Sequence, residues 1–320
     1  MVRPRCAVLD DYQGVALDVA DWTPVRDAVD VEVFREHIAD PDALVEAIGD
    51  HEIVVIMRER TPFDATLLAR LPQLRLLVTT GMRNAAIDLA AAAGHGVVVC
   101  GTQGRAQPTA ELTWGLILDL ARSITAENTA LRADGPWQST LGTDLAGARL
   151  GVLGLGRLGS QVARVGLAFG MDVVAWSPHL TTERAAAAGV GLAASKAELF
   201  ATSDVVTIHL VLGPGTRGLV GAGELAVMRP GAYLVNTSRG PIVDEDALIA
   251  ALRAGRIAGA ALDVFDVEPL PADHPFRTLP NVLATPHLGY VTHGTYEVFY
   301  RDAVEDIAAF LRGTPIRVLG

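Results

Sequence analysis

The sequence is poor in cysteine and almost without lysine: its 320 residues include two cysteines and a single lysine. Cys6 and Cys100 lack the close spacing of metal ligands, so we expect no metal site and two buried thiols in a reducing compartment, which favours a cytoplasmic protein. A Schiff-base mechanism would have to use Lys196, whose surroundings, ASKAELF, are typical of an exposed helix start.

Long apolar runs and basic clusters are also missing. No apolar run approaches the ~18 residues that a membrane span needs, so we expect no membrane association. The N-terminal segment, MVRPRCAVLDDYQG, has no long apolar core and no small-residue cleavage site, so we do not expect a signal peptide. The formal net charge is −11 and no block of Lys and Arg offsets it, which argues against a nucleic-acid partner.

Short β-branched runs alternate with helical stretches along the whole chain, which indicates parallel sheets with crossover helices. Five strands are expected in the first third of the chain, at 7–9, 31–34, 53–57, 76–79 and 97–100. Six more are expected at 150–153, 173–176, 205–209, 232–236, 259–264 and 282–284. We therefore predict an α/β protein with two Rossmann- or flavodoxin-like, doubly wound parallel-sheet domains and an active-site cleft between them.

Two long helical patterns, at 108–122 and 292–312, are expected to carry the chain from the first domain to the second and back. Residues 317–319 would then rejoin the first domain. We predict a discontinuous domain of residues 1–101 plus 290–320, which encloses a domain of residues 102–289.

Residues 148–177 contain the pattern of a dinucleotide-binding turn. A short apolar strand leads into Gly154-Leu-Gly156-Arg157-Leu158-Gly159, and a helix and a second strand follow. Gly154 suits the tight turn, Gly156 the close approach of a pyrophosphate, and Gly159 the packing of helix on strand. The segment 102–289 is therefore predicted to bind NAD or NADP.

The acidic residue that usually holds the adenosine ribose is absent at the end of the second strand, where Ser177 stands in Trp-Ser-Pro-His. A carboxylate there would repel the 2′-phosphate of NADP. No arginine follows directly to bind that phosphate, and Arg184 is the nearest in sequence. We expect weak discrimination between the two cofactors, with a slight preference for NAD.

Three segments in the second half each follow an apolar strand and carry the residues that reduction of a 2-oxo acid needs. The planar guanidinium of Arg239 can bind a carboxylate and the adjacent carbonyl. His287 can protonate the alkoxide that hydride transfer leaves, and a carboxylate such as Glu268 beside it favours the protonated ring. We predict that Arg239, Glu268 and His287 are catalytic and that the substrate is a small 2-oxo or 2-hydroxy acid.

At these motifs the sequence resembles the D-2-hydroxyacid dehydrogenases, over essentially the whole chain. The resemblance rests on the glycine turn, SDVVTIHL at 203–210, MRPGAYLVNTSRGPIVDEDAL at 228–248, ALDVFDVEP at 261–269 and ATPHLGYVT at 284–292. It implies the catalytic roles given above, a homodimer, and further cofactor contacts from His209, Leu210, Asn236, Thr237, Ser238, Asp263 and Gly289.

The same resemblance places 79–88, TTGMRNAAID, at the substrate-binding loop of the first domain. The loop is often Gly-x-Gly in the family but reads Gly81-Met82-Arg83 here, so a long cation replaces a glycine. Arg58 and Arg60 follow the strand at 53–57. These surplus cations predict a substrate with a second anionic group, although solvated charges at a strand end are an equally good interpretation of Arg58 and Arg60.

Two other functions stay open. One is oxidation of formate, although the family pattern for that activity has Gln where this chain has Glu268. The other is a dinucleotide-sensing corepressor with little turnover, which can keep the same residues. Among the remaining histidines, His37, His51, His95 and His274 are interpreted as loop or surface residues.

Overall fold

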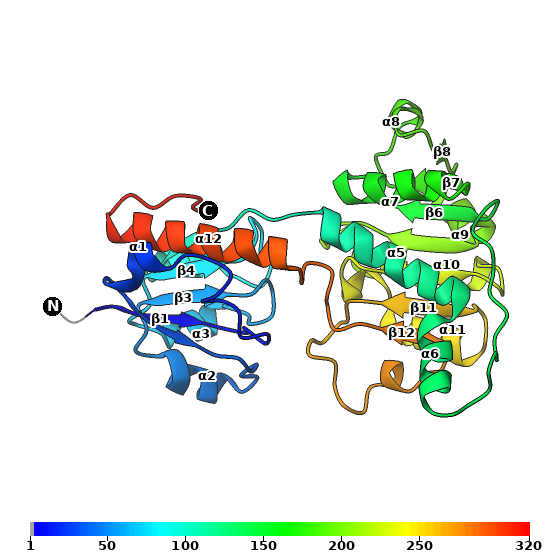
Figure 1. The fold of residues 1–320 in the computed structure, drawn as a ribbon. Helices are drawn as coiled ribbons and strands as arrows, with labels where there is room; N and C mark the ends of the chain where they lie inside the picture. The colour runs from blue at the N-terminus through cyan, green and yellow to red at the C-terminus, as the bar shows by residue number, and fades with distance from the viewer. Residues whose placement is uncertain (1–2) are drawn as a thin grey trace. The chain divides into compact units, whose positions relative to one another are not determined.

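The protein, described here by a computed structural model over residues 3–320, divides into two compact units. Unit 1 is Met1–Arg105 with Thr292–Gly320, and unit 2 is Ala106–Val291. Each unit is built on one parallel sheet, so the predicted α/β class with two parallel sheets is confirmed (Figure 1). No helix in the described part of the chain is long and apolar enough to cross a membrane.

Unit 1 has a five-stranded parallel sheet in the order β2-β1-β3-β4-β5. Its elements are β1 (Arg5–Val8), α1 (Thr23–Arg26), β2 (Asp30–Val33), α2 (Pro41–Ile48), β3 (Ile53–Ile56), α3 (Ala65–Ala69), β4 (Leu76–Thr79), α4 (Leu89–Gly94), β5 (Val98–Gly101) and α12 (His293–Leu311). In Figure 1, α12 and α1 lie along one face of this sheet and α2 and α3 along the other. Strands β3 and β4 are consequently buried along their whole length.

The chain returns to the edge of this sheet after α12, at residues 317–319. Val318 forms an antiparallel bridge with Cys100, and the Arg317 carbonyl accepts a 3.0 Å hydrogen bond from the Gly101 amide. The Arg317 guanidinium binds Asp306 of α12, with Nε 3.0 Å from Oδ1. Asp306 is fully buried, so this ion pair fastens the C-terminal segment to the last helix.

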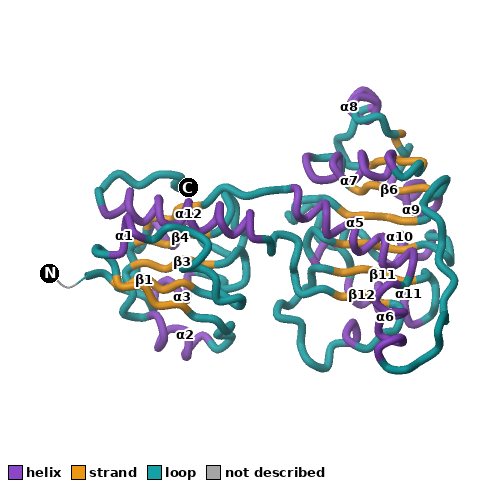
Figure 2. Tube along the Cα trace, in the orientation of Figure 1, coloured by secondary structure: helices purple, strands orange, loops and turns teal. Residues whose placement is uncertain are grey.

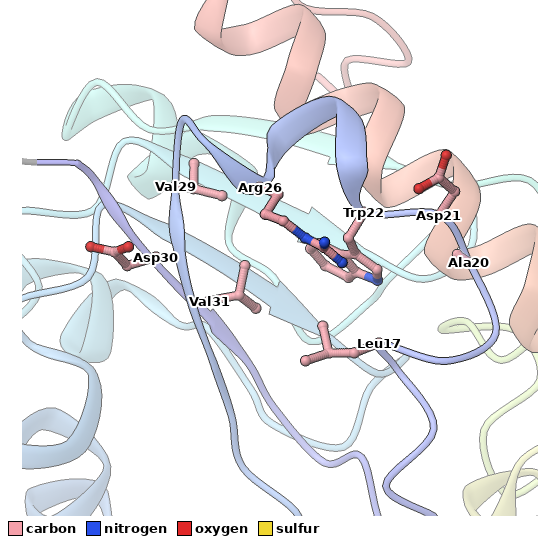
Figure 3. Close-up of a pocket in the computed structure, with 8 residues that line it drawn as sticks. All are labelled: Leu17, Ala20, Asp21, Trp22, Arg26, Val29, Asp30 and Val31. Carbon is pink, nitrogen blue, oxygen red and sulfur yellow. The ribbon is translucent and has the colours of Figure 1, made fainter.

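A hollow of about 400 Å³ opens beside α1 in unit 1 (Figure 3). It is lined by Leu17, Ala20, Asp21, Trp22, Arg26, Val29, Asp30 and Val31. None of the predicted site residues lines it.

Unit 2 has a seven-stranded parallel sheet in the order β12-β11-β10-β9-β6-β7-β8. Its strands are β6 (Arg149–Leu153), β7 (Asp172–Trp176), β8 (Gly191–Leu192), β9 (Val205–Ile208), β10 (Tyr233–Asn236), β11 (Gly259–Leu262) and β12 (Val282–Ala284). Its helices are α5 (Gln107–Arg122), α6 (Ile124–Arg132), α7 (Arg157–Ala168), α8 (Thr182–Ala187), α9 (Lys196–Thr202), α10 (Ala222–Val227) and α11 (Glu245–Arg253), with 3-10 turns η1 (Gly240–Ile242) and η2 (Pro275–Arg277). Helices α5 and α7 pack together in one layer of the core, and α9, α10 and α11 pack in another.

Several elements of the structure lie outside the ranges that the sequence predicts. Among them are α1, β8 and α6, and none of the side chains of α6 is buried. A long loop follows α6 before β6 begins (Figure 2).

The single lysine begins α9 and ties this helix to the segment before α10. Lys196 Nζ donates a 2.7 Å hydrogen bond to the Leu219 carbonyl and lies 2.9 Å from Glu224 Oε1. The ammonium group is therefore structural, in keeping with the sequence prediction that it is not a reactive amine.

Candidate active site

The turn between β6 and α7 forms a cradle of backbone amides at the carboxyl end of β6. Gly154 has φ +102°, and a Cβ atom there would lie 2.6 Å from the carbonyl oxygen of His209. A Cβ on Gly159 would lie 2.0 Å from the Gly154 carbonyl oxygen. A Cβ on Gly156, by contrast, would meet no protein atom within 4 Å, and no side chain caps α7. Protein packing explains two of the glycines, and the open space at Gly156 fits the pyrophosphate of a dinucleotide.

The cradle lies where the strand order of the seven-stranded sheet reverses, between β6 and β9. His209 and Leu210 follow β9 and border Gly154, whereas Arg157 and Leu158 begin α7, with Arg157 exposed. Open α/β sheets bind ligands in the crevice at this point.

Burial lowers the pKa of His209 to about 3, so its ring stays neutral, with Nε2 2.9 Å from Thr207 Oγ1. Its buried Nδ1 has no hydrogen-bond partner within residues 3–320.

Ser177 follows β7 directly and is partly buried in a turn, where its carbonyl accepts a hydrogen bond from the Leu180 amide. The structure also places Arg184, the arginine nearest to Ser177 in sequence. Arg184 of α8 donates to the carbonyl of His179 at 3.4 Å, so its guanidinium lies against the loop that follows Ser177.

The turn after β10 carries Arg239 and is held by its own side chains. Asn236 Nδ2 donates to the Arg239 carbonyl at 3.0 Å, and Asn236 Oδ1 accepts from the Ser238 amide at 3.0 Å. The Ser238 hydroxyl donates to the Leu210 carbonyl, and the Thr237 hydroxyl lies 2.8 Å from that of Thr113. These bonds tie the turn after β10 to the loop after β9. They also fix the position of the backbone of Arg239, whose side chain is partly buried.

His287 and Glu268, from the segments after β12 and β11, form a close pair. His287 Nδ1 lies 2.6 Å from Glu268 Oε2, while Glu268 Oε1 accepts the Phe265 amide at 3.0 Å. The His287 side chain is 13% exposed and packs edge-on against the ring of Tyr290. Because Nδ1 is committed to the carboxylate, Nε2 is the atom that can exchange a proton with a ligand.

Asp263 holds the loop on which His287 stands. Its fully buried carboxylate accepts hydrogen bonds from the Thr285 hydroxyl at 2.6 Å, the Leu288 amide at 2.7 Å and the Gly289 amide at 2.9 Å. Burial raises the pKa of Asp263, and these hydrogen bonds act in the opposite direction. The resemblance places Asp263 against the cofactor; the structure shows that its carboxylate is bound to the loop of His287.

The loop after β4 and the residues after β3 pack together in unit 1. Arg58 has φ +54°, donates Nη1 to the Thr80 carbonyl at 3.1 Å and covers Gly81 so closely that a Cβ there would lie 1.8 Å from Nη1. Met82 and Arg83 follow, both exposed. Arg58 therefore supports the backbone of this loop, and Gly81, whose φ of +99° favours glycine, leaves room for its guanidinium.

Sequence reasoning missed a polar cluster in the same unit. His37, predicted to be a loop or surface residue, lies in the loop after β2 with Nδ1 2.9 Å from Oδ1 of Asp10, and Asp10 is 2% exposed. His51, also predicted to be a loop or surface residue, lies in the loop before β3 and is 1% exposed. The sequence around Asp10 does not predict that this aspartate is buried. Its partners come from loops that are distant in sequence, so no local pattern links them to it.

Comparison with known proteins adds to this geometry. Residues 114–289 match the sequence profile described as "D-isomer specific 2-hydroxyacid dehydrogenase, NAD binding domain". A glyoxylate reductase from Aeropyrum pernix is 36% identical over 98% of this chain and 94% of its own length. A D-3-phosphoglycerate dehydrogenase from Methanocaldococcus jannaschii is 37% identical over 85% of this chain, and the chain spans about half (52%) of that relative.

The solved structure of a phosphoglycerate oxidoreductase from Vibrio cholerae superimposes with a TM-score of 0.93 at 38% identity, covering 97% of this chain and 99% of that one. The fold has two α/β units, and the site combines a glycine turn suited to a dinucleotide with a histidine that contacts a carboxylate. The chain belongs to the D-isomer specific 2-hydroxyacid dehydrogenase family.

Proposed function

We propose that the protein is an NAD(H)-dependent 2-oxo acid reductase that also catalyses the reverse oxidation of a 2-hydroxy acid, and that it works in the cytoplasm. The observation that carries this proposal is the 2.6 Å contact between His287 and Glu268, on the same sheet as the glycine cradle. When bound, the nicotinamide supplies hydride from C4 to C2 of the oxo acid, or accepts it in the reverse direction.

Three side chains share the remaining chemistry. The Arg239 guanidinium binds the substrate carboxylate and polarises the carbonyl. His287 gives the proton at Nε2 to the carbonyl oxygen, which becomes the hydroxyl as C2 receives the hydride. The Glu268 carboxylate beside Nδ1 stabilises the imidazolium before transfer and keeps the ring oriented.

The test is steady-state reduction of a panel of 2-oxo acids with NADH and with NADPH, together with oxidation of formate. Turnover of at least one 2-oxo acid with no turnover of formate is the expected result. Turnover of formate instead would favour the formate-oxidising alternative. Tight cofactor binding without turnover of any 2-oxo acid would favour the corepressor.

We also propose that the cofactor site discriminates weakly and slightly prefers NADH. Ser177 carries no charge that would repel a 2′-phosphate. Arg184 is the cation nearest this loop in sequence, and its contact with the His179 carbonyl gives a 2′-phosphate some attraction.

The substrate is proposed to carry a second anionic group, a carboxylate or a phosphate. Arg60 and Arg83 follow β3 and β4 at the edge of the sheet where α/β proteins bind ligands. Relatives named D-3-phosphoglycerate dehydrogenase act on such an acid, which supports the proposal. In the panel, dianions should be reduced faster than monoanions of equal length, and Arg83→Ala should reduce that preference. An Arg83→Ala variant that slows both classes equally would make Arg83 structural.

The protein is finally proposed to form a homodimer through residues 124–142, which we call the arm. Its large apolar side chains are exposed: Ile124 54%, Leu131 58%, Trp137 80% and Leu141 98%. The arm is nevertheless held in place, because Glu127 Oε1 accepts the amides of Ser139 at 3.0 Å and Thr140 at 2.7 Å. An ordered apolar surface of this kind is typical of a protein interface, and the arm of a second copy offers the same apolar surface.

A further inference from the structure

The strand order of unit 1 also reverses once, between β1 and β3. In an open sheet with the order 2-1-3-4-5, this is the point where a crevice forms beyond the carboxyl ends of the strands. Tyr12 follows β1 and Arg60 follows β3, so the fold brings these two residues to that point. Neither a fingerprint nor a catalytic motif marks Tyr12 in the sequence.

Tyr12 and Arg60 are in direct contact. The central carbon of the Arg60 guanidinium lies 4.8 Å from the centroid of the Tyr12 ring, which is the geometry of a cation–π pair. Burial of the phenol and the nearby Asp10 raise the pKa of Tyr12, and the charge of Arg60 acts in the opposite direction. The Tyr12 ring therefore covers one face of the guanidinium, and 38% of the tyrosine is exposed.

A buried carboxylate fixes the two loops that carry this pair. Asp10, with φ +59°, is two residues before Tyr12, and its Oδ2 accepts a 2.8 Å hydrogen bond from the hydroxyl of Thr61, the neighbour of Arg60. Its Oδ1 is 2.9 Å from Nδ1 of His37 in the loop after β2. Both Asp10 and Thr61 are nearly inaccessible, at 2% and 3% exposed. One carboxylate thus ties together the loops after β1, β2 and β3.

We propose that Tyr12 is a specificity-determining residue, which holds Arg60 for contact with the distal carboxylate or phosphate of the substrate, and that Asp10 and Thr61 are positioning residues for this pair. The inference rests on the proposed reduction of a 2-oxo acid with a second anionic group. It adds the residues that decide how strongly that group is selected. A guanidinium already held in place loses less conformational freedom on binding than a mobile one.

The test compares two oxo acids of equal length, 2-oxoglutarate and 2-oxovalerate, through the ratio of their kcat/KM values. Tyr12→Leu removes the aromatic face and should lower this ratio about three- to thirty-fold, the range of a cation–π contact. Tyr12→Phe keeps the face and should change the ratio less than about two-fold. The loss should appear in KM for the dianion rather than in kcat.

Thr61→Val and Thr61→Ser form the matched pair for the positioning role. Valine keeps the shape but removes the hydroxyl bonded to Asp10, and should lower the ratio; serine keeps the hydroxyl and should preserve it.

Arg60→Ala tests the second-anion site itself, separately from the roles of Tyr12, Asp10 and Thr61. If Arg60→Ala lowers the ratio while Tyr12→Leu and Thr61→Val do not, the roles of Tyr12, Asp10 and Thr61 are overturned and the proposed second-anion site stands. If Arg60→Ala also leaves the ratio unchanged, or no 2-oxo acid is reduced, the inference falls together with the part of the proposed function on which it rests.

Discussion

His287, Asp10 and Arg58 share a backbone conformation that side chains rarely adopt, with φ between +53° and +59°. Each costs on the order of 1 kcal/mol or more and persists only where surrounding contacts impose it. Those contacts are visible in each case: Asp263 binds the loop of His287, Thr61 binds Asp10, and the Thr80 hydroxyl accepts the Arg58 amide at 2.9 Å. All three residues lie at or beside the proposed binding sites, where a fixed backbone keeps the side chains that would contact a ligand in place.

His287→Ala should lower kcat by at least about 100-fold, because the oxyanion formed at the substrate then has no proton donor. Glu268→Gln should also lower kcat, since a neutral amide stabilises the imidazolium less than a carboxylate does. Rates are measured under saturating NADH, with cofactor affinity from fluorescence titration as the control. A His287→Ala variant with near-normal kcat would contradict the assignment.

Ser177→Asp should shift cofactor preference firmly toward NADH. The new carboxylate repels a 2′-phosphate and accepts hydrogen bonds from the ribose hydroxyls. The measurement is kcat/KM for NADH and for NADPH in both proteins, and Ser177→Asn serves as the uncharged control. A wild-type preference for either cofactor above ~1000-fold, roughly 4 kcal/mol, would show that another contact decides.

The sequence could identify candidate residues that lie within short motifs. It could not identify residues that are distant in sequence and come into contact only in the folded protein. Gly154, Arg239, Glu268 and His287 each follow a recognisable apolar strand, and parallel strands end at one edge of a sheet. The cluster of Asp10 with His37 and Thr61 depends on contacts between residues 27 and 51 positions apart. No periodicity connects such positions, so a single sequence cannot show that they meet.

At the scale of elements, the junction of α12 with the C-terminal segment is built around a buried carboxyl group, that of Asp306. Burial raises the pKa of Asp306 to about 7, although Arg317 acts in the opposite direction, and Asp302 and Glu305 add to the increase. The folded protein binds this proton more tightly than the unfolded chain. The free energy of unfolding should therefore fall as the pH rises from about 4 to about 7.

Asp306→Asn should flatten this part of the pH dependence, because the side chain no longer titrates. Urea unfolding at several values between pH 4 and pH 8 measures the slope, with the exposed Asp18→Asn as the control. An Asp306→Asn slope equal to that of the wild type would show that Asp306 does not titrate in this range.

Long, periodic elements were predictable, whereas short or exposed ones were not. The sequence prediction contains the five strands of unit 1 and six of the seven strands of unit 2. Strand β8 has two residues and α1 has four, too few for any period to repeat. Helix α6 has no buried side chain and so lacks the apolar face by which a helix is recognised.

At the scale of the whole molecule, the arm should determine the oligomeric state. Trp137→Ser combined with Leu141→Ser should convert the proposed dimer into a monomer, because both side chains are mostly exposed within one chain. Sedimentation velocity measures the mass, with Val211→Ser, an exposed apolar residue outside the arm, as the control. A wild-type protein that sediments as a monomer would contradict the dimer.

The isolated position of Lys196 makes the protein convenient for covalent labelling. An amine-directed reagent can modify only this side chain and the α-amino group of the 320-residue chain. Because the ammonium is held by Leu219 and Glu224, its acylation rate reports how often the start of α9 separates from the neighbouring segment. A dye or a surface tether can thus be placed at a known point of unit 2 without substituting a residue.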